Sequence, residues 1–173
     1  MPIIRSELKG DYASIFTIHQ SAFKRDIEAE LVNRLRTTNY YHSELSLVAE
    51  ENSELVGHLL LTRVVIKDGN KTYPVLALAP IGIKEAFQRK GIGSILIEEA
   101  LKKAKYLGHK AVIVLGDPKY YARFGFEKAS NYEITPPTNF PEEVFLIKKL
   151  SPEDLDFKGQ VIYPVQFNMI IDK

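Results

Sequence analysis

The residues best suited to chemistry in this chain form a glycine-containing turn before a segment with helical spacing. The first four N–H groups of a helix lack partners within the helix, and the helix dipole is positive there. Glycine carries no Cβ that would keep a bulky anion away from those amides, and flanking cations add charge. The turn therefore predicts a phosphate site. Its residues are Gln88, Arg89, Lys90, Gly91, Ile92, Gly93 and Ser94.

Two better-known phosphate loops do not match this turn. A P-loop needs lysine and then serine or threonine after its last glycine, whereas Gly93 is followed by Ser94 and Ile95. A Rossmann turn needs a third glycine where Leu96 stands, and an acidic residue about twenty positions on, where 111–115 offers none. A glycine pair that only starts a helix, with surface cations beside it, stays the alternative.

Other chemistry-bearing residues are sparse. The chain contains no cysteine, which excludes disulfides, thiolate zinc sites and a cysteine nucleophile. The four histidines have no HExxH or similar ligand spacing, so we expect no metal site. They are His19, His42, His58 and His109.

A strand before the turn and a helix after it must position these residues. The segment 73–83 is apolar, as expected for a strand covered on both faces, and Pro80 should bulge or split it because proline cannot donate to a ladder. After the turn, apolar residues recur with helical spacing until Gly108, which indicates a long helix. A short buried strand at 111–115 and a brief helix at 118–124 follow.

The remaining segments complete a mixed domain. Two helices are expected at 11–23 and 27–35, and in the second the charged residues Glu28, Glu30, Arg34 and Arg36 are expected to face water. An antiparallel hairpin is expected from residues 45–51 and 55–66. Further strand candidates are 2–7, Phe126, 132–134, 144–149 and 160–167, and an irregular loop is expected at 135–141. This order predicts an α/β or α+β fold with a mixed sheet.

Length and charge set outer limits on the function. The chain has 173 residues and a formal net charge of +1. We expect one domain over 1–173, with a core at about 1–150 and a C-terminal strand extension at 151–173. Balanced charge argues against a nucleic-acid partner. The first residues become charged too early for a signal peptide, and no apolar run approaches the roughly 18 residues of a membrane span, so we expect a cytoplasmic protein without a membrane partner.

Several coupled motifs resemble the GNAT superfamily of N-acetyltransferases. Five segments follow one another in the order found in that superfamily. They are the strand Leu-Ala-Pro-Ile-Gly-Ile at 78–83, the turn at 88–93, a helix, a short strand and Tyr-Ala-Arg-Phe-Gly-Phe at 121–126. The turn is similar to its Q/R-x-x-G-x-G/A signature. The segment 116–121, the 45–58 hairpin and the late Tyr-Pro at 163–164 resemble the bacterial YhbS-like branch, so the resemblance covers nearly the whole chain. It implies a GNAT-like acyl-CoA N-acyltransferase fold, in which helices flank a mostly antiparallel central sheet.

The resemblance implies acetyl-CoA as the cosubstrate. Backbone amides of 88–94 are implied to bind its diphosphate. Ile81, Gly82 and Ile83 are implied to pair with the pantetheine arm like an extra strand, and an amide there would polarise the thioester carbonyl. Asp117, which lies in the segment shared with the branch, is counted with the cofactor-binding residues.

Tyr121 matches the position of a tyrosine general acid in many GNAT enzymes. A phenol has a reference pKa of about 10, so it is protonated at neutral pH and can donate to a departing thiolate. The alternative is a packing aromatic whose hydroxyl bonds to the backbone.

The general base is less well defined. Many relatives carry a glutamate on the strand at 81–83, and this sequence has none there. His58, Glu50 and Asp117 are the candidate substitutes, and His58 is favoured because histidine has the best reference pKa for this task. A buried packing histidine, or an amine already deprotonated by solvent, stays an alternative.

The sequence therefore predicts an N-acetyltransferase that moves an acetyl group from acetyl-CoA to a primary amine by direct attack, through a tetrahedral intermediate. The alternative is a binding or sensing module that keeps the acetyl-CoA site but has lost turnover. The acceptor, either a small-molecule amine or a protein amine, is not identified by the sequence. Late strands of such folds often pair, which leaves a homodimer open.

Overall fold

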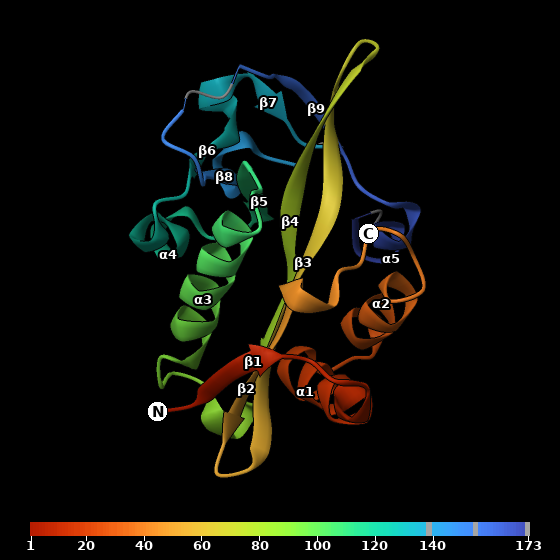
Figure 1. Ribbon diagram of the computed structural model, residues 1–173, viewed down its shortest axis with the longest axis vertical. Helices are drawn as coiled ribbons and strands as arrows, with labels where there is room; N and C mark the ends of the chain where they lie inside the picture. The colour runs from red at the N-terminus through yellow and green to blue at the C-terminus, as the bar shows by residue number, and fades with distance from the viewer. Residues whose placement is uncertain (138–139, 154–155, 172–173) are drawn as a thin grey trace.

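A long hairpin of two strands runs through the centre of the structure (Figure 1). The computed structural model describes residues 1–137, 140–153 and 156–171. Its strands are β1 (Ile3–Ser6), β2 (Ser46–Glu51), β3 (Glu54–Asp68), β4 (Lys71–Ile83), β5 (Ala111–Leu115), β6 (Glu127–Lys128), β7 (Ile134–Thr135), β8 (Phe145–Lys149) and β9 (Gly159–Ile162). Its helices are α1 (Tyr12–Phe23), α2 (Ile27–Leu35), α3 (Ile92–Tyr106), α4 (Pro118–Tyr121) and α5 (Asn168–Ile171).

The described strands form one mixed sheet. The main order is β1-β2-β3-β4-β5-β8-β6, with β9 paired to β3 and β7 paired to β9. The pairs β4–β5 and β7–β9 are parallel, and the other pairs are antiparallel. Helix α3 lies on one side of the central hairpin, and α1 and α2 lie on the other (Figure 1). The predicted fold, a mostly antiparallel sheet flanked by helices, is confirmed.

Side-chain alternation along β3 builds a core on each face of the sheet. Leu59 and Leu61 belong to the cluster packed under α3, whereas Leu60 between them belongs to the cluster under α1 and α2. Successive strand residues point to opposite faces, so a strand covered by helices on both sides is apolar throughout. This explains why β3 lacks the alternating polar pattern of a half-exposed strand.

Several element boundaries differ from the predictions. Helix α3 begins at Ile92, so the last residues of the glycine turn form its first turn. The strand predicted at 160–167 ends at Ile162 and continues as a 3-10 turn over Val165–Phe167, because Pro164 has no N–H for a ladder. Residues 132–134 contribute only Ile134 to a strand. Of the loop predicted at 135–141, residues 138–139 lie outside the described residues, as do 154–155 and 172–173 of the predicted C-terminal extension.

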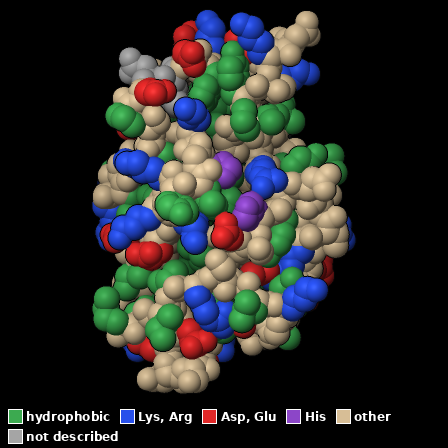
Figure 2. Space-filling model, in the orientation of Figure 1, with side chains coloured by type: hydrophobic (Ala, Val, Ile, Leu, Met, Phe, Trp, Pro, Cys, Tyr) green, Lys and Arg blue, Asp and Glu red, His purple; other side chains and the backbone are tan. Residues whose placement is uncertain are grey.

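Charged side chains of both signs are interspersed over the face shown in Figure 2. None of the helices in the described ranges has the length and apolar character needed to cross a bilayer.

Candidate acyl-transfer site

The glycine turn borders a cavity of about 440 Å³ at the start of α3. Gly91 is the N-cap residue, with φ at +84°, and it brings no side chain to occupy the helix terminus. A Cβ built on Gly91 would meet nothing within 4 Å, which leaves open space on that side of the turn. Among the described residues, the cavity lining comprises Ile83, Phe87, Gln88, Arg89, Gly91, Ile92, Gly93, Ser94, Tyr120 and Arg123. These features fit an anion that faces the first amides of the helix.

Two side chains at the turn have roles that the sequence did not indicate. The Gln88 amide donates to the Ile83 carbonyl oxygen at 2.8 Å, which ties the turn to the end of β4. Lys90 does not line the cavity, and its Nζ lies 5.6 Å from the centre of the Phe87 ring. The second cation at the cavity is instead Arg123, whose guanidinium lies over the Tyr120 ring.

The adjacent strands β4 and β5 separate beside this cavity. They pair at Leu76–Val112 and Ala77–Ile113, and no later β4 residue has a partner on β5. A second cavity of about 210 Å³ opens in the gap. The described residues that line it are Phe23, Glu28, Leu78, Ala79, Pro80, Ile81, Val114, Leu115, Tyr121 and Ile170. The edge of β4 beyond Ala77 is therefore available to an extended ligand.

The three residues predicted at the end of β4 face different surroundings. Ile81 lines the gap between the strands, and Ile83 lines the cavity of the glycine turn. Gly82 lines neither, because its α-carbon faces α1. A Cβ on Gly82 would lie 2.7 Å from Nδ1 of His19, so only glycine permits this approach. The end of β4 thus connects the two cavities.

Tyr121 lies in the wall of the gap with its side chain largely buried. Its ring packs edge-on against Phe126 and Tyr120, at centroid distances of 5.4 and 5.1 Å. Burial raises the pKa of Tyr121 to about 12. Its hydroxyl makes no hydrogen bond to another described residue, contrary to the alternative of a hydroxyl that bonds to the backbone. The phenol is therefore protonated at neutral pH and has a proton to donate.

The position of Tyr121 depends on a glycine. A Cβ on Gly116 would lie 2.4 Å from Cε2 of Tyr121, far inside van der Waals contact. The sequence analysis treated 116–121 only as a shared motif. Close approach of a ring to the backbone explains why this position holds glycine.

Asp117 and Glu50 have structural partners away from both cavities. Asp117 is the N-cap of α4, and its Oδ1 accepts the Lys119 N–H at 3.0 Å. Neither cavity includes Asp117 in its described lining, so its assignment to the cofactor site gains no support. Glu50 forms an ion pair with Arg5 at 3.2 Å.

Glu28 lies in the site, although it was expected to face water. Its side chain is 6% exposed and lines the same cavity as Tyr121. Glu28, Val32 and Leu35 have the i, i+4, i+7 spacing of one helix face, and all three are buried. This spacing was the signal in the sequence that could have placed Glu28 inside.

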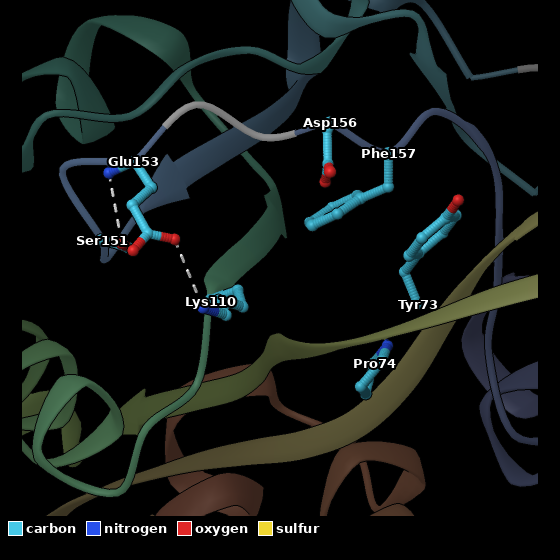
Figure 3. Close-up of a pocket in the computed structure, with 7 residues that line it drawn as sticks. All are labelled: Tyr73, Pro74, Lys110, Ser151, Glu153, Asp156 and Phe157. Atoms are coloured by element: carbon cyan, nitrogen blue, oxygen red, sulfur yellow. Dashed lines mark hydrogen bonds and ion pairs between the residues drawn. The ribbon is translucent and has the colours of Figure 1, made fainter.

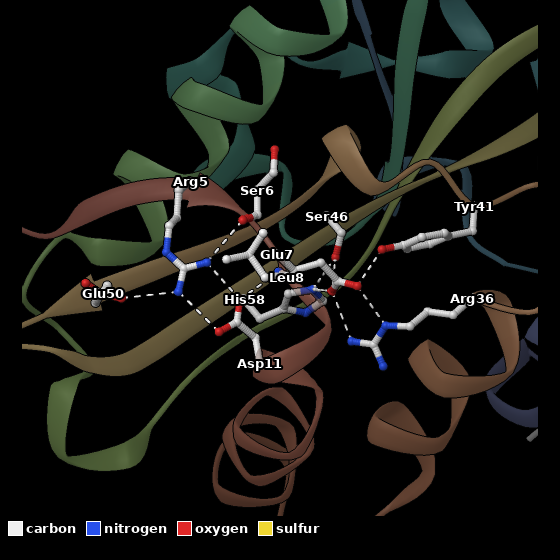
Figure 4. A network of polar contacts seen from close by, with 10 residues as sticks. All are labelled: Arg5, Ser6, Glu7, Leu8, Asp11, Arg36, Tyr41, Ser46, Glu50 and His58. Carbon is white, nitrogen blue, oxygen red and sulfur yellow. Dashed lines mark hydrogen bonds and ion pairs between the residues drawn. The ribbon is translucent and has the colours of Figure 1, made fainter.

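His58 belongs to a buried polar network centred on Glu7 (Figure 4). The Glu7 carboxylate accepts hydrogen bonds from Nε and Nη2 of Arg36, from the Tyr41 hydroxyl, and from the Ser46 hydroxyl at 2.5 Å. His58 is fully buried, and its Nε2 lies 2.8 Å from the Ser46 hydroxyl. Arg36, which was expected to face water, is 7% exposed in this network.

For neutral imidazoles, the hydrogen bonds of this network assign the histidine tautomers. Ser46 donates to Glu7, so its oxygen accepts from Nε2–H of His58. Nδ1 of His58 then accepts from Nε2 of His19 at 2.8 Å. Burial favours the neutral form of both imidazoles, because it lowers the pKa of each. Nδ1 of His19 is buried without a hydrogen-bond partner among the described residues.

This environment does not support His58 as the general base. Burial lowers the pKa of His58, and the attraction of Glu7 only partly opposes that shift. His58 lines neither cavity and has no exposed surface through which to reach an amine. Its contacts instead match the alternative of a packing histidine with satisfied polar atoms.

The network predicts that the protein loses stability in acid. Burial, with His58 and Arg36 nearby, lowers the pKa of His19 well below its usual range, as burial also does for His58. Hydrogen bonds also hold the pKa of Glu7 below its ordinary value despite its burial. The unfolded chain therefore binds more protons than the folded one below about pH 6.5. For each histidine that stays neutral in the folded state, the free energy of unfolding falls by about 1.4 kcal/mol per pH unit in that range. Thermal unfolding should give a lower Tm at pH 5 than at pH 7.5.

A double variant, His19→Asn with His58→Asn, tests the source of this pH dependence. It should show a shallower change in Tm between pH 7 and pH 5, whatever its absolute stability. An unchanged slope would assign the acid sensitivity to other groups.

A third cavity, of about 260 Å³, lies at the opposite end of β4 (Figure 3). Tyr73 stacks on Phe157 in its wall, with ring centroids 5.0 Å apart. Its charged residues include Lys110, which pairs with Glu153 at 3.8 Å. The glycine turn and Tyr121 do not belong to its described lining. We therefore place the candidate site at the end of β4 near Ile83.

The fold and the site together define an acetyltransferase domain of the GNAT type. The sequence model of the acetyltransferase (GNAT) domain matches residues 4–129, and the chain belongs to this family. Among curated proteins, it is similar to the uncharacterised N-acetyltransferase YhbS of Escherichia coli K12, with 29% identity over 168 residues, covering 96% of this chain and 98% of YhbS. It also resembles YjhQ of Escherichia coli K12, with 31% identity over 158 residues, covering 88% of this chain and 87% of YjhQ.

Solved structures agree with this assignment. A crystal structure of Escherichia coli YhbS in complex with CoA superposes with a TM-score of 0.89, covering 96% of this chain and 92% of that one at 29% identity. A GNAT family acetyltransferase from Brucella melitensis in complex with acetyl-CoA gives a TM-score of 0.78 at 31% identity, covering 96% of this chain and 98% of that one.

Proposed function

We propose that the protein transfers an acetyl group from acetyl-CoA to the nitrogen of a primary amine. The observation that carries this proposal is the pair of cavities connected by the end of β4. One cavity has the free helix terminus and two cations, and the other contains Tyr121. A donor with a diphosphate at one end and a reactive thioester at the other matches this arrangement.

The residues present fit acetyl-CoA. The amides at the start of α3, with Arg89 and Arg123, would hold the diphosphate. The unpaired edge of β4 would bind the pantetheine arm as an added strand, which uses main-chain hydrogen bonds. The complexes of YhbS with CoA and of the Brucella melitensis relative with acetyl-CoA support this choice.

Two groups of the chain would act in the reaction. Acetyl-CoA, when bound, supplies a thioester whose carbonyl carbon accepts the amine. A backbone N–H at the end of β4, in the segment 81–83, would stabilise negative charge on the carbonyl oxygen, an effect worth about 3 kcal/mol. The Tyr121 hydroxyl would donate its proton to the departing sulfur, because its raised pKa keeps it protonated until a thiolate forms.

Calorimetry with acetyl-CoA and a thiol-release assay with an amine panel test this proposal. We expect saturable binding of acetyl-CoA and amine-dependent release of free thiol. Binding without release for any amine would favour the non-catalytic binding or sensing module. Absence of binding would contradict both functions.

Replacing Gly93 with leucine should weaken acetyl-CoA binding at least about tenfold, because the added side chain would cover amides that face the cavity. Calorimetry at fixed salt measures the change. Gly10→Leu is the matched control, because a Cβ at Gly10 meets nothing within 4 Å and Gly10 lies outside both cavities. Equal affinity of both variants and the wild type would argue that the diphosphate lies elsewhere.

A further inference from the structure

The cavity between β4 and β5 contains one charged side chain among its described lining residues. This is Glu28, at the second position of α2. The rest of the lining is apolar apart from the hydroxyl of Tyr121 and the main chain. A carboxylate and a phenol from different elements therefore line the same small space.

The Glu28 carboxylate is held in place without being saturated. Arg25 Nε donates to its Oε1 at 2.9 Å, and Arg25 Nη2 donates to its Oε2. An ionised carboxylate has about four acceptor positions, so this fork of Arg25 leaves two of them for another donor. The Arg25 side chain is 49% exposed, whereas that of Glu28 is 6% exposed. The arginine thus approaches from the solvent side, and the carboxylate reaches the cavity.

We propose that Glu28 binds the ammonium group of the acceptor and takes its proton before attack on the thioester. This inference rests on the proposed acetyl transfer and adds to it the base and the acceptor class. It also assigns a carboxylate in place of the glutamate that many relatives carry on the strand at 81–83 and that this chain lacks. The helix α2, instead of β4, supplies the carboxylate.

The proton balance of this step is complete. Glu28 takes one proton from the ammonium, and the neutral nitrogen forms the C–N bond while the C–S bond breaks. Tyr121 gives its proton to the sulfur and regains one from the nitrogen, and Glu28 releases its proton to water. The products are an N-substituted acetamide, a free thiol and one proton.

The same cavity limits the class of acceptor. Its volume of about 210 Å³ is below the usual 300–1,000 Å³ of small-molecule sites, and under the proposed function the thioester arm of the donor enters the same gap. The space that remains beside Glu28 would hold only a small amine or the ammonium end of a longer chain. The apolar walls favour an acceptor whose nitrogen is attached to a hydrocarbon chain. A carboxylate on the carbon beside the nitrogen would meet Glu28 in surroundings of low polarity, where like charges repel strongly. We therefore assign primary alkylamines, without an adjacent carboxylate, as the acceptor class.

A matched substrate pair tests the acceptor class. Propylamine and 2-aminobutyrate have the same carbon chain beside the nitrogen, and only the second carries a carboxylate there. With saturating acetyl-CoA, the wild type should have a kcat/KM for propylamine at least about tenfold higher. Equal or greater efficiency with 2-aminobutyrate would overturn the assignment.

Variants at Glu28 test its role. Glu28→Gln keeps the shape but cannot take a proton, so kcat/KM for propylamine should fall at least about 100-fold. Glu28→Asp keeps the charge and should recover part of the loss. Glu30→Gln, on the exposed side of the same helix, should behave like the wild type. Acetyl-CoA affinity should be unchanged in all three.

The outcomes separate this inference from the proposed function. If the wild type acetylates propylamine and Glu28→Gln does so equally well, the role of Glu28 is wrong while the activity stands. If the wild type acetylates another amine of the panel but not propylamine, the acceptor class is wrong while the activity stands. If it binds acetyl-CoA but acetylates no amine of the panel, the proposed activity and the role of Glu28 in it are both overturned.

Discussion

Tyr121→Phe should lower kcat for acetyl transfer by about 10²- to 10⁴-fold, the range usually contributed by a positioned general acid. Phenylalanine keeps the ring that packs against Phe126 but removes the proton donor. The departing sulfur would then leave as a thiolate or wait for a proton from water. Binding of acetyl-CoA should change little, because no interaction of the hydroxyl holds the site together. Steady-state rates from thiol release, together with calorimetry, measure both quantities.

Two controls make this result specific. Tyr106→Phe removes a hydroxyl from an 86% exposed tyrosine on α3 and should not alter the rate. Gly116→Ala should lower kcat while leaving the phenol present, because a Cβ there would lie 2.4 Å from the Tyr121 ring. Wild-type turnover by Tyr121→Phe would show that the sulfur obtains its proton elsewhere.

The second large effect concerns stability. Glu7→Ala should lower the free energy of unfolding by about 3–5 kcal/mol, because it leaves the buried Arg36 guanidinium without its counter-charge. The Tyr41 and Ser46 hydroxyls would also lose an acceptor in a largely buried site. Chemical denaturation at pH 7.5 measures this change.

The matched control is Glu98→Ala, which removes an exposed carboxylate from α3 and should leave stability nearly unchanged. The pair Glu7→Leu with Arg36→Met should be more stable than Glu7→Ala alone, since removing both charges avoids an unpaired one. A loss below about 1 kcal/mol for Glu7→Ala would mean that the ion pair contributes no more than an exposed one.

The central fold and the glycine turn could be predicted because both depend on local signals. Helical spacing after Gly93 and the continuous apolar character of β3 and β4 follow directly from which faces the elements bury. The bulge expected at Pro80 is confirmed, since the register between β3 and β4 shifts opposite it, between Leu59 and Leu61. The strand predicted at 144–149 is confirmed as β8, within one residue. The other late strands, β6, β7 and β9, were predicted less well, because they are two to four residues long and carry little pattern.

For the charged residues of α2, the local pattern is compatible with two buried faces and does not decide between them. Ile27, Leu31 and Leu35 defined one apolar stripe of α2, but the helix packs along a wider face that also buries Glu28 and Ala29. Whether a carboxylate at the edge of that face points inward depends on neighbours from β4 and β5, which are distant in sequence.

The Glu7 network has the same limitation. Its members come from the residue after β1, the residue after α2, the segment between α2 and β2, and the strands β2 and β3. No spacing along the chain relates them. The sequence therefore left both a catalytic base and a packing residue open for His58 until its partners were known.

The short pairing between β4 and β5 means that the proposed reaction would change the rigidity of the sheet. Among the described residues, these strands join the two halves of the sheet at two residue pairs alone, Leu76–Val112 and Ala77–Ile113. Under the proposed function, each arriving donor would complete the sheet as a temporary strand, and each departing thiol would reopen it. The stiffness of the core would then rise and fall once per catalytic round, in step with the loading of the coenzyme.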